Sequence, residues 1–273
     1  MTDVQATLTF AVKQDAKPYF KSSALTGGLP EIFFETEDCL VEIRDMRPLA
    51  DDLSLQRQGF VLLQNETSVH DLYDDGLIER VYNREVAELL KEYTGADRVV
   101  IFDHTRRSDN ADGATNPDGS RGPAGRVHVD YTPTSGPARA RDAIGDADYD
   151  RIMNNGGRLM QINVWRPISG PVKRTPLALA DAQSIDASEM LLTDQIFPDR
   201  VGEIYQLAHD SGQVWYWVPE MRRDEILLIK GWDSTEDEHT RYSAHGAFLL
   251  PDQRPDDPPR ESIETRTYVI FDR

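Results

Sequence analysis

Short apolar runs separated by Pro- and Gly-containing turns dominate the second half of the chain. Each run has the length of a strand, and no regular helical pattern separates successive runs. This arrangement favours an antiparallel barrel or jelly roll over a parallel α/β sheet. Strands are predicted at residues 158–167, 176–181, 213–218, 225–233, 245–251 and 262–271.

The first half of the chain is more mixed. Residues 1–56 show no sustained period, and we interpret them as an N-terminal arm wrapped on a core. The run GFVLL at 59–63 predicts a buried strand, as does VVIFDHT at 99–105. Apolar residues at helical spacing over 74–93 predict a helix that ends at Gly95.

A polar segment at 106–125 is rich in Gly, Asp and Asn. Such a composition disfavours packing, and it suggests the hypothesis of a loop that closes over a site. The expected fold is mainly β with helical additions. We expect a single domain over residues 1–273, with the arm at 1–56 and the barrel core at about 99–273.

Charge and cysteine content narrow the class of protein. The 30 basic and 48 acidic residues give a formal net charge of −18, which repels a nucleic-acid backbone and an anionic membrane surface alike. Cys39 is the only cysteine, so no disulfide can form within the chain. The N-terminal residues MTDVQATLTF lack the pattern of a secretory signal. No apolar run approaches the roughly 20 residues of a membrane helix. A cytoplasmic protein is expected. The acidic surface permits a homodimer, which no sequence feature establishes.

The stretch RVHVDYTP at 126–133 carries the main chemical signal. Side chains at i and i+2 of a strand project from one face, so His128 and Asp130 would point together. Such a pair can chelate a metal, and iron(II) held by two histidines and one carboxylate keeps open positions for other ligands. His245 heads a short apolar strand and could meet the pair across the barrel as the third ligand. His209 and His239 lie in polar stretches and are expected at the surface.

A second signal lies near the C-terminus, where Arg260 and Ser262 share one face of the last predicted strand. A guanidinium beside a hydroxyl suits the distal carboxylate of a dicarboxylate such as 2-oxoglutarate. Arg266 has the same strand parity and is an alternative anchor, and Arg254 is a further substitute. Each arginine could equally be an exposed residue paired with a nearby acid.

The order of these motifs resembles the iron(II)/2-oxoglutarate-dependent oxygenases, and in particular the branch with cephem methoxylase-like and gibberellin desaturase-like proteins. The motifs are H-x-D, N-x-W-R-P, P-L-A-L-A-D, A-H-G-A-F and R-E-S-I-E-T-R, from about Val99 to the C-terminus. The resemblance implies a double-stranded β-helix, a jelly-roll or cupin-like barrel. It also implies Fe(II) bound by His128, Asp130 and His245, and 2-oxoglutarate held by Arg260 with Ser262.

The implied activity is that of a dioxygenase, an oxidoreductase that uses O2 and 2-oxoglutarate to oxidise a small molecule of specialised metabolism. Hydroxylation, desaturation and oxidative cyclisation all remain open. Two other classes are kept as alternatives. A cupin-like metal-dependent enzyme without 2-oxoglutarate chemistry would use the same ligands, and a non-catalytic binding protein would be expected to have lost one of them.

Five further residues are candidates for contact with the substrate. They flank the motifs or lie on the predicted strands, although aromatic side chains on strands more often pack in a core. The candidates are His104, Arg106, Tyr131, Trp165 and Arg166.

Overall fold

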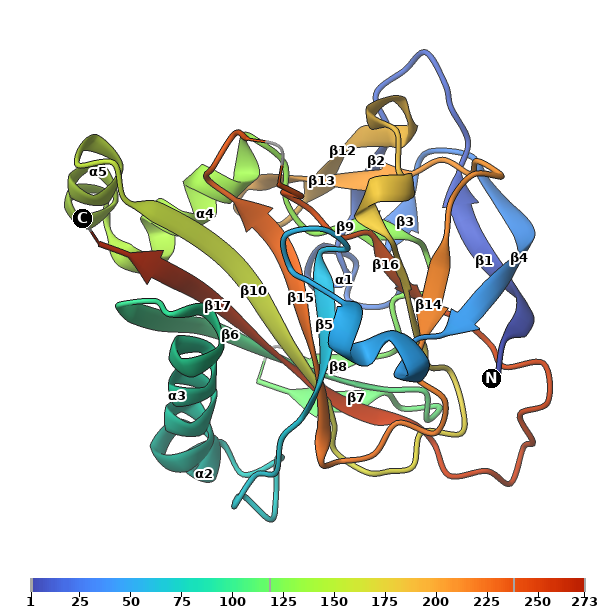
Figure 1. Cartoon of the computed structure of the whole chain (residues 1–273). Coiled ribbons are helices and arrows are strands. Elements are labelled where there is room, and N and C mark those ends of the chain that lie inside the picture. The colour runs from blue at the N-terminus through green and yellow to red at the C-terminus, as the bar shows by residue number, and fades with distance from the viewer. Residues whose placement is uncertain (1, 118, 238, 273) are drawn as a thin grey trace.

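Two mainly antiparallel β-sheets packed face to face form the body of the protein (Figure 1). The computed structural model describes residues 2–117, 119–237 and 239–272. Within these residues the larger sheet has ten strands, in the spatial order β1 (Val4–Ala11), β4 (Thr36–Asp45), β14 (Trp215–Trp217), β11 (Leu177–Ala180), β16 (His245–Ala247), β9 (His128–Val129), β13 (Val201–Leu207), β12 (Met190–Ile196), β2 (Tyr19–Lys21) and β3 (Glu31–Ile32). The smaller sheet has the order β5 (Phe60–Gln64), β15 (Glu225–Asp233), β10 (Arg158–Pro167), β17 (Glu261–Phe271) and β6 (Arg98–Ser108).

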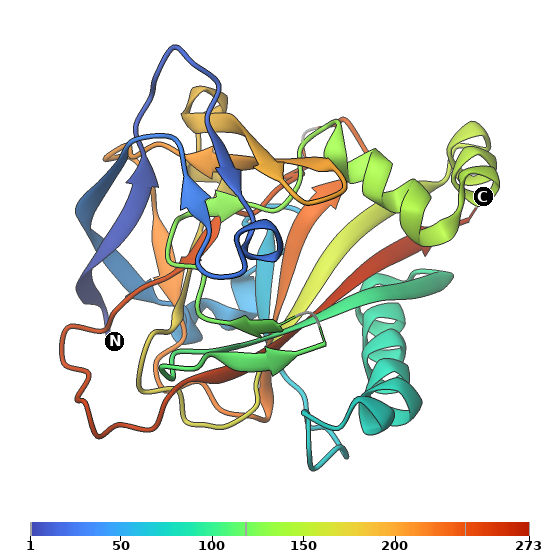
Figure 2. The same ribbon diagram turned by 180° about the vertical axis from the view of Figure 1, so that it is seen from behind.

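Helices cover the smaller sheet and one end of the space between the sheets (Figure 2). Thus the expected mainly β fold with helical additions is confirmed. The helical elements are α1 (Ser23–Thr26), η1 (Arg47–Asp52), α2 (Asp75–Leu77), η2 (Ile78–Tyr82), α3 (Asn83–Thr94), α4 (Ser135–Ile144), α5 (Asp146–Asn154), η3 (Ala182–Ser184) and η4 (Ala187–Glu189). A small hairpin, β7 (Ala114–Asn116) with β8 (Gly119–Arg121), lies beside β6.

The alternation of side chains along β10 explains where a site can form. On one face of the strand the central residues Met160, Ile162 and Val164 are apolar and pack with α3 and η2 in a large cluster. The side chains of the other face point between the two sheets, and they change from apolar to polar and back along the strand. In order, they are Leu159, Gln161, Asn163 and Trp165.

Leu159 belongs to the apolar cluster under α4 and α5, and Trp165 belongs to the cluster that joins the two sheets at the other end. Gln161 and Asn163 lie between these clusters and are fully buried. Buried amides require hydrogen-bond partners, so the polar middle of this row marks a built site and not a gap in the core.

The predicted strands and the predicted helix end are largely present. Gly95 adopts a left-handed conformation (φ 73°) directly after α3, where a residue with a side chain would be strained. The helix is not uniform, because a π-helical turn at η2 precedes α3. The prediction missed α5 and the hairpin of β12 and β13, whose residues alternate too weakly in polarity.

The N-terminal arm is more integrated than expected. Residues of β1 and β4 pair along eight positions, and β4 then joins β14 in parallel, so the arm supplies strands of the larger sheet. The polar segment 106–125 also differs from the expected unpacked loop. Its hairpin buries Ala114 and Asn116, and Asn116 accepts a hydrogen bond from the backbone N–H of Arg106 (2.7 Å).

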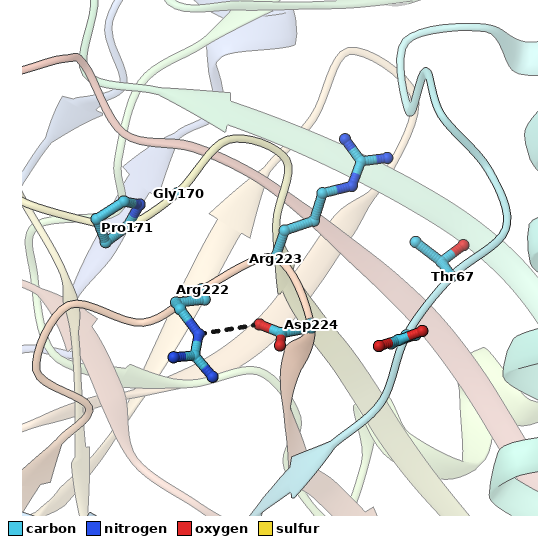
Figure 3. Close-up of a pocket in the computed structure, with 7 residues that line it drawn as sticks. Thr67, Gly170, Pro171, Arg222, Arg223 and Asp224 are labelled. Carbon is cyan, nitrogen blue, oxygen red and sulfur yellow. Dashed lines mark hydrogen bonds and ion pairs between the residues drawn. The ribbon is translucent and has the colours of Figure 1, made fainter.

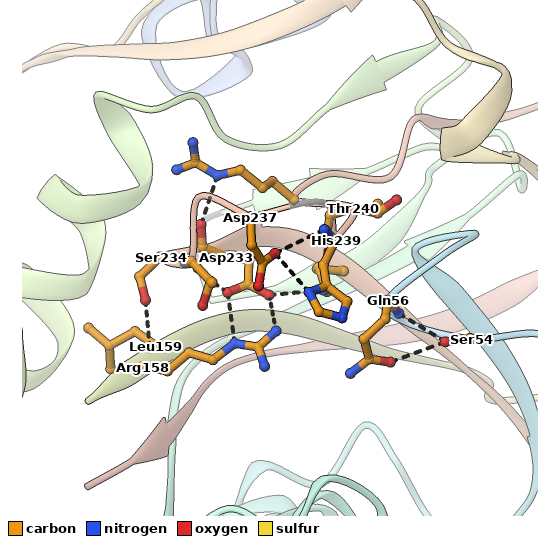
Figure 4. Close-up of polar contacts among 12 residues, drawn as sticks. Ser54, Gln56, Arg158, Leu159, Asp233, Ser234, Asp237, His239 and Thr240 are labelled. Atoms are coloured by element: carbon orange, nitrogen blue, oxygen red, sulfur yellow. Dashed lines mark hydrogen bonds and ion pairs between the residues drawn. The ribbon is translucent and has the colours of Figure 1, made fainter. Parts of the chain in front are cut away.

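A charged network fixes the far ends of β10 and β15 (Figure 4). Arg158 donates to both carboxylate oxygens of Asp233, at 3.0 and 2.5 Å. The ammonium of Lys230, which is fully buried, lies 2.9 Å from the same carboxylate and 2.8 Å from the carbonyl oxygen of Thr240. These ion pairs hold the bulged end of the strand pair together.

Candidate metal centre

Three side chains that can ligate a metal meet on the inner face of the larger sheet. His128 on β9 and His245 on β16 are direct cross-strand partners, with ring centroids 4.6 Å apart. Asp130 follows β9, and its Oδ1 lies 3.5 Å from Nε2 of His128. One ligand atom from each of the three residues lies within 4.8 Å of the other two. This is the two-histidine, one-carboxylate set that suits Fe(II).

Backbone carbonyl groups orient both imidazoles. Nδ1 of His128 lies 2.9 Å from the carbonyl oxygen of Arg126, and Nδ1 of His245 lies 3.1 Å from that of Ser243. A carbonyl oxygen can only accept, so each Nδ1 carries the proton and each Nε2 presents its lone pair. Both rings are therefore held in the tautomer that a metal requires.

The charge state of the cluster also suits a cation. Burial alone would raise the pKa of Asp130, but the positive charge of Arg266 outweighs it and holds that pKa well below its usual range. Burial, together with the nearby His128, lowers the pKa of His245. One carboxylate and a neutral imidazole are the forms that bind divalent iron.

The second carboxylate oxygen of Asp130 is already occupied. Nδ2 of Asn163 donates to Oδ2 at 2.6 Å, and Nε2 of Gln161 donates to Oδ1 of Asn163 at 2.6 Å. Both amides come from the polar middle of β10. They connect the smaller sheet to the candidate metal ligands on the larger one.

A small pocket opens next to the three ligands, and three arginines line it: Arg107, Arg260 and Arg266. Arg266 is paired with Glu264, which also lines the pocket, at 2.8 Å. Arg260 is 2 % exposed, and its guanidinium donates to the carbonyl oxygen of Thr175 (3.2 Å). Within the described residues, its Nε and one terminal nitrogen are buried without a partner. Burial and the charge of Arg107 lower the pKa of Arg260 to about 10. Such an unsatisfied guanidinium fits a carboxylate ligand.

The other residues predicted to hold the co-substrate, Ser262, Arg266 and Arg254, differ in whether they line the pocket. Ser262 is buried and pairs with Arg107 on β6, but it is not among the residues that line the pocket. Arg266 lines the pocket but is committed to Glu264, so it is less suited to be an anchor. Arg254 is exposed and pairs with Asp257 at 3.3 Å.

Three of the five expected substrate contacts lie away from the pocket, because strand parity turns their side chains to the opposite face. His104 packs against Thr265 on the outer face, and burial lowers its pKa to about 4. Arg106 donates to the carbonyl oxygen of Leu72 and to Asp75 at the start of α2.

Arg166 is the third of these residues. It donates to the hydroxyl of Tyr82 and to the backbone of Asn65 and Arg223. Its contacts join β10 to the π-helical turn and to the neighbouring loops. Arg106 and Arg166 thus hold the helical cover on the sheet, which accounts for their burial without a substrate.

The two aromatic candidates have different surroundings. Trp165 lines the pocket, and the guanidinium of Arg260 lies 5.8 Å from its ring centroid. Tyr131 is packed in the apolar cluster under α4 and α5, and burial raises its pKa. Only Trp165 is therefore placed to contact a ligand in this pocket.

Sequence reasoning missed Arg107, Glu264, Asn163 and Gln161. The signal for Arg107 was its register: it faces Ser262 across β6 and β17, so it shares the inner face with the last strand's polar row. The prediction named Arg106, the neighbouring residue, whose side chain lies on the opposite face of β6. No sequence signal distinguishes the two amides of β10 from ordinary polar positions.

A wider surface depression lies away from these ligands, between the loops that follow β5 and β10 and the loop before β15 (Figure 3). Arg222 pairs with Asp224 there at 3.2 Å, and Arg223 donates to the carbonyl oxygens of Ile168 and His70. None of the residues that line it is a histidine or cysteine. Its composition does not suit iron.

Two packed sheets with two histidines, one carboxylate and a buried arginine between them define the class of non-haem iron oxygenases with a jelly-roll fold. Comparison with known proteins agrees. The model of a family described as "Oxidoreductase/YMDC permease-like domain" matches residues 8–270. The hydroxylase/desaturase efuI of Hormonema carpetanum is 32% identical, over 93% of this chain and 93% of its own.

The Fe(II)/2-oxoglutarate-dependent dioxygenase nvfI of Aspergillus novofumigatus is also 32% identical, over 85% of this chain and 84% of its own. A solved structure of the iron and alpha-ketoglutarate-dependent endoperoxidase NvfI superposes with a TM-score of 0.86 and 29% identity, over 100% of this chain and 99% of the other. The chain belongs to the Fe(II)/2-oxoglutarate-dependent dioxygenases.

This membership confirms the predicted class of enzyme, its jelly-roll fold and its cofactors, Fe(II) and 2-oxoglutarate. Its substrates are O2 and a small molecule. The alternatives of a cupin-like enzyme without 2-oxoglutarate and of a non-catalytic binding protein are not supported. In the part of the chain that the structure describes, no helix is both long and apolar enough to cross a membrane.

Proposed function

We propose that His128, Asp130 and His245 bind the catalytic Fe(II). The observation that carries this proposal is the meeting of exactly one carboxylate and two correctly oriented imidazoles on one inner face. The donor set fits Fe(II) and leaves the remaining positions for other ligands.

The far carboxylate of 2-oxoglutarate is proposed to bind Arg260. The guanidinium lies in the same pocket as the proposed metal ligands, and two of its buried nitrogens have no partner in the part of the chain that the structure describes. A buried cation is costly unless it is paired, so an incoming carboxylate supplies what the protein itself does not. Arg107 is half-buried, lines the same pocket and, among the described residues, has no carboxylate within ion-pair distance, so it adds positive potential there.

With Fe(II) bound, O2 would supply the oxidising power for attack on a C–H bond of the substrate, and 2-oxoglutarate would supply two of the electrons that reduce O2. The chain's own residues bind and orient. The two carbonyl groups hold the imidazole tautomers, Arg260 fixes the co-substrate, and the apolar clusters at both ends of the pocket exclude water.

We infer that the organic substrate is a small molecule of specialised metabolism and that Trp165 contacts it. This inference rests on the position of Trp165 and on relatives named as a hydroxylase/desaturase and as an aspirochlorine biosynthesis protein. Hydroxylation, desaturation and cyclisation are each compatible with this site.

We also infer that residues 1–273 form one oxygenase domain, because β1 and β4 of the arm extend the sheet that carries the ligands. A net charge of −18 supports the absence of nucleic-acid and membrane partners. The cytoplasmic location and the homodimer stay predictions. Light scattering on the purified protein would decide the oligomeric state.

The test of the proposed function is an anaerobic titration of metal-free protein with Fe(II) and then 2-oxoglutarate. We expect a weak visible charge-transfer band that requires both additions and that is absent in His128→Ala. A band of unchanged intensity in His128→Ala would refute the assignment of the ligands. Arg200→Gln, at an exposed position on the loop between β12 and β13, serves as a control for the substitution procedure.

A further inference from the structure

A pair of buried amides distinguishes the two carboxylate oxygens of Asp130. Asn163 donates to Oδ2 at 2.6 Å, while Oδ1 lies on the side of His128, 3.5 Å from Nε2. Asp130 could otherwise present both oxygens to one ion, because a carboxylate binds metals with either one or two oxygens. Because Oδ2 accepts the hydrogen bond from Asn163, Oδ1 is the oxygen that stays available to a metal.

The orientation of the Asn163 amide is itself fixed. Its Oδ1 accepts from Nε2 of Gln161 at 2.6 Å, so its NH2 group must face Asp130. Both amides are fully buried, which prevents water from replacing either hydrogen bond. The orientation thus follows from a chain of donors that begins at Gln161 and ends at the carboxylate.

A glycine makes room for this arrangement. A Cβ atom placed on Gly231 would lie 1.9 Å from Oε1 of Gln161, so any side chain at this position would displace the amide. Gly231 is in β15, next to the point where the register with β10 shifts. The register shift and the absence of a side chain at Gly231 together leave the space that the Gln161 side chain occupies.

We propose that Gln161 and Asn163 act as positioning residues that hold Asp130 as a one-oxygen ligand and so keep coordination positions free for 2-oxoglutarate and O2. This inference rests on the proposed function. It concerns residues that contact neither the metal nor the substrate, and that act only through Asp130. Removal of the Asn163 donor leaves a buried anionic oxygen without a partner, and outer hydrogen bonds to metal ligands typically contribute about 10- to 100-fold in metal affinity.

Asn163→Leu tests this directly, since leucine has a similar volume and no donor. We expect Fe(II) affinity, measured anaerobically by calorimetry, to fall about 10- to 100-fold. The charge-transfer band with 2-oxoglutarate is expected to shift or weaken, because a two-oxygen carboxylate competes with the co-substrate. Asn116→Leu is the matched control: Asn116 is also a buried, hydrogen-bonded asparagine, but it lies on β7 and donates to the carbonyl oxygens of Arg106 and Ala114 instead of to Asp130.

Gln161→Leu provides a second, independent measure. Gln161 acts through Asn163, so its substitution should lower the affinity in the wild-type background and have no further effect in the Asn163→Leu background. If Asn163→Leu fails to fold, Gln161→Leu and Asn163→Ser answer the same question. Asn163→Ser keeps a hydrogen-bond donor at this position, so it should retain more of the Fe(II) affinity than Asn163→Ala, which keeps none.

The results separate this inference from the proposed function. Loss of Fe(II) binding in His128→Ala, together with wild-type affinity and an unchanged band in folded Asn163→Leu, would overturn the positioning role alone. Unchanged Fe(II) binding in His128→Ala would overturn the proposed ligands instead. Additive effects of the two leucine substitutions would also contradict a shared route through Asp130.

Discussion

His128 and His245 are direct cross-strand neighbours in the larger sheet, with their rings 4.6 Å apart. The third ligand was expected to meet the first two from across the barrel. Instead, β16 returns beside β9, and both imidazoles leave the same sheet on the same face. Their separation is therefore set by strand pairing, which is far less adjustable than packing between sheets.

The arginines of the pocket should differ in their effect on 2-oxoglutarate. Arg260→Gln removes charge-assisted hydrogen bonds worth about 1.5–3 kcal/mol each, so we expect the Kd for 2-oxoglutarate to rise on the order of 10- to 100-fold or more. Arg107→Gln should have a smaller effect, because Arg107 is half-buried and its charge is screened. Calorimetry on the anaerobic Fe(II)-loaded protein measures both.

Arg254→Gln is the control for this comparison, because the side chain of Arg254 is 69% exposed and pairs with Asp257. An effect of Arg254→Gln as large as that of Arg260→Gln would show that the anchor had been assigned to the wrong arginine. Arg266→Gln should disturb Fe(II) binding more than 2-oxoglutarate binding, since Arg266 faces Asp130 and is paired with Glu264.

Gly136 in α4 offers a test in which two effects oppose each other. An alanine in a helix is favoured over glycine by up to about 1 kcal/mol. A Cβ at this position would, however, lie 2.5 Å from the ring of Trp232, and such overpacking typically costs about 1–3 kcal/mol. We expect Gly136→Ala to lower the free energy of unfolding in a urea titration, whereas Gly28→Ala, with open space around it, should change it little.

Asp233 should make the stability dependent on pH in the acid range. Burial by itself raises the pKa of Asp233, but the hydrogen bond from Arg158 and the charge of Lys230 outweigh it and lower the pKa. The unfolded chain then binds more protons than the folded one, so the stabilisation is fully present above the unfolded pKa of about 3.9 and is lost as the pH falls through the lower folded value.

The corresponding variant is Asp233→Asn. Because it leaves Lys230 buried without its carboxylate, we expect a loss of about 3–5 kcal/mol near pH 7, and a weaker dependence of the remaining stability on acid pH. Denaturant titrations from pH 7 to pH 3 would measure this. Asp199→Asn is the exposed control. Equal stability of Asp233→Asn and the wild type at pH 7 would be inconsistent with a structural role of the network.

The segment 106–125 remains a hypothetical lid. Ala124 lines the pocket, and Arg107 donates to the carbonyl oxygen of Gly122, so the segment borders the site. If it closes over bound ligands, limited proteolysis within it should slow when Fe(II) and 2-oxoglutarate are added together. Unchanged cleavage would argue against a lid, and cleavage at 25–30 of the N-terminal arm provides the internal reference.

The fold class and the proximity of His128 and Asp130 could be predicted because both depend on short-range patterns. Strand runs reveal a β fold, and the i, i+2 spacing of His128 and Asp130 brings the two side chains together without further knowledge of the fold. His245 could be selected only because it heads an apolar strand. Its true position depends on which strand pairs with β9, and no local pattern specifies that pairing.

The remaining site residues were hidden because their roles depend on register between distant strands. Arg106 and Arg107 are adjacent, yet only Arg107 faces the pocket, and the choice follows from the pairing of β6 with β17. Likewise, Asn163 reaches Asp130 only because the two sheets pack face to face. A sequence shows which residues share a strand face but not which face is turned inward when both faces are buried.

The most direct test of the account is a crystal structure of the protein grown anaerobically with Fe(II) and 2-oxoglutarate, with data collected at the iron absorption edge. We predict a single strong anomalous peak in contact with Nε2 of His128, Nε2 of His245 and one oxygen of Asp130, and a co-substrate carboxylate at Arg260. A peak at any other place, or none at these three residues in iron-saturated crystals, would contradict the account.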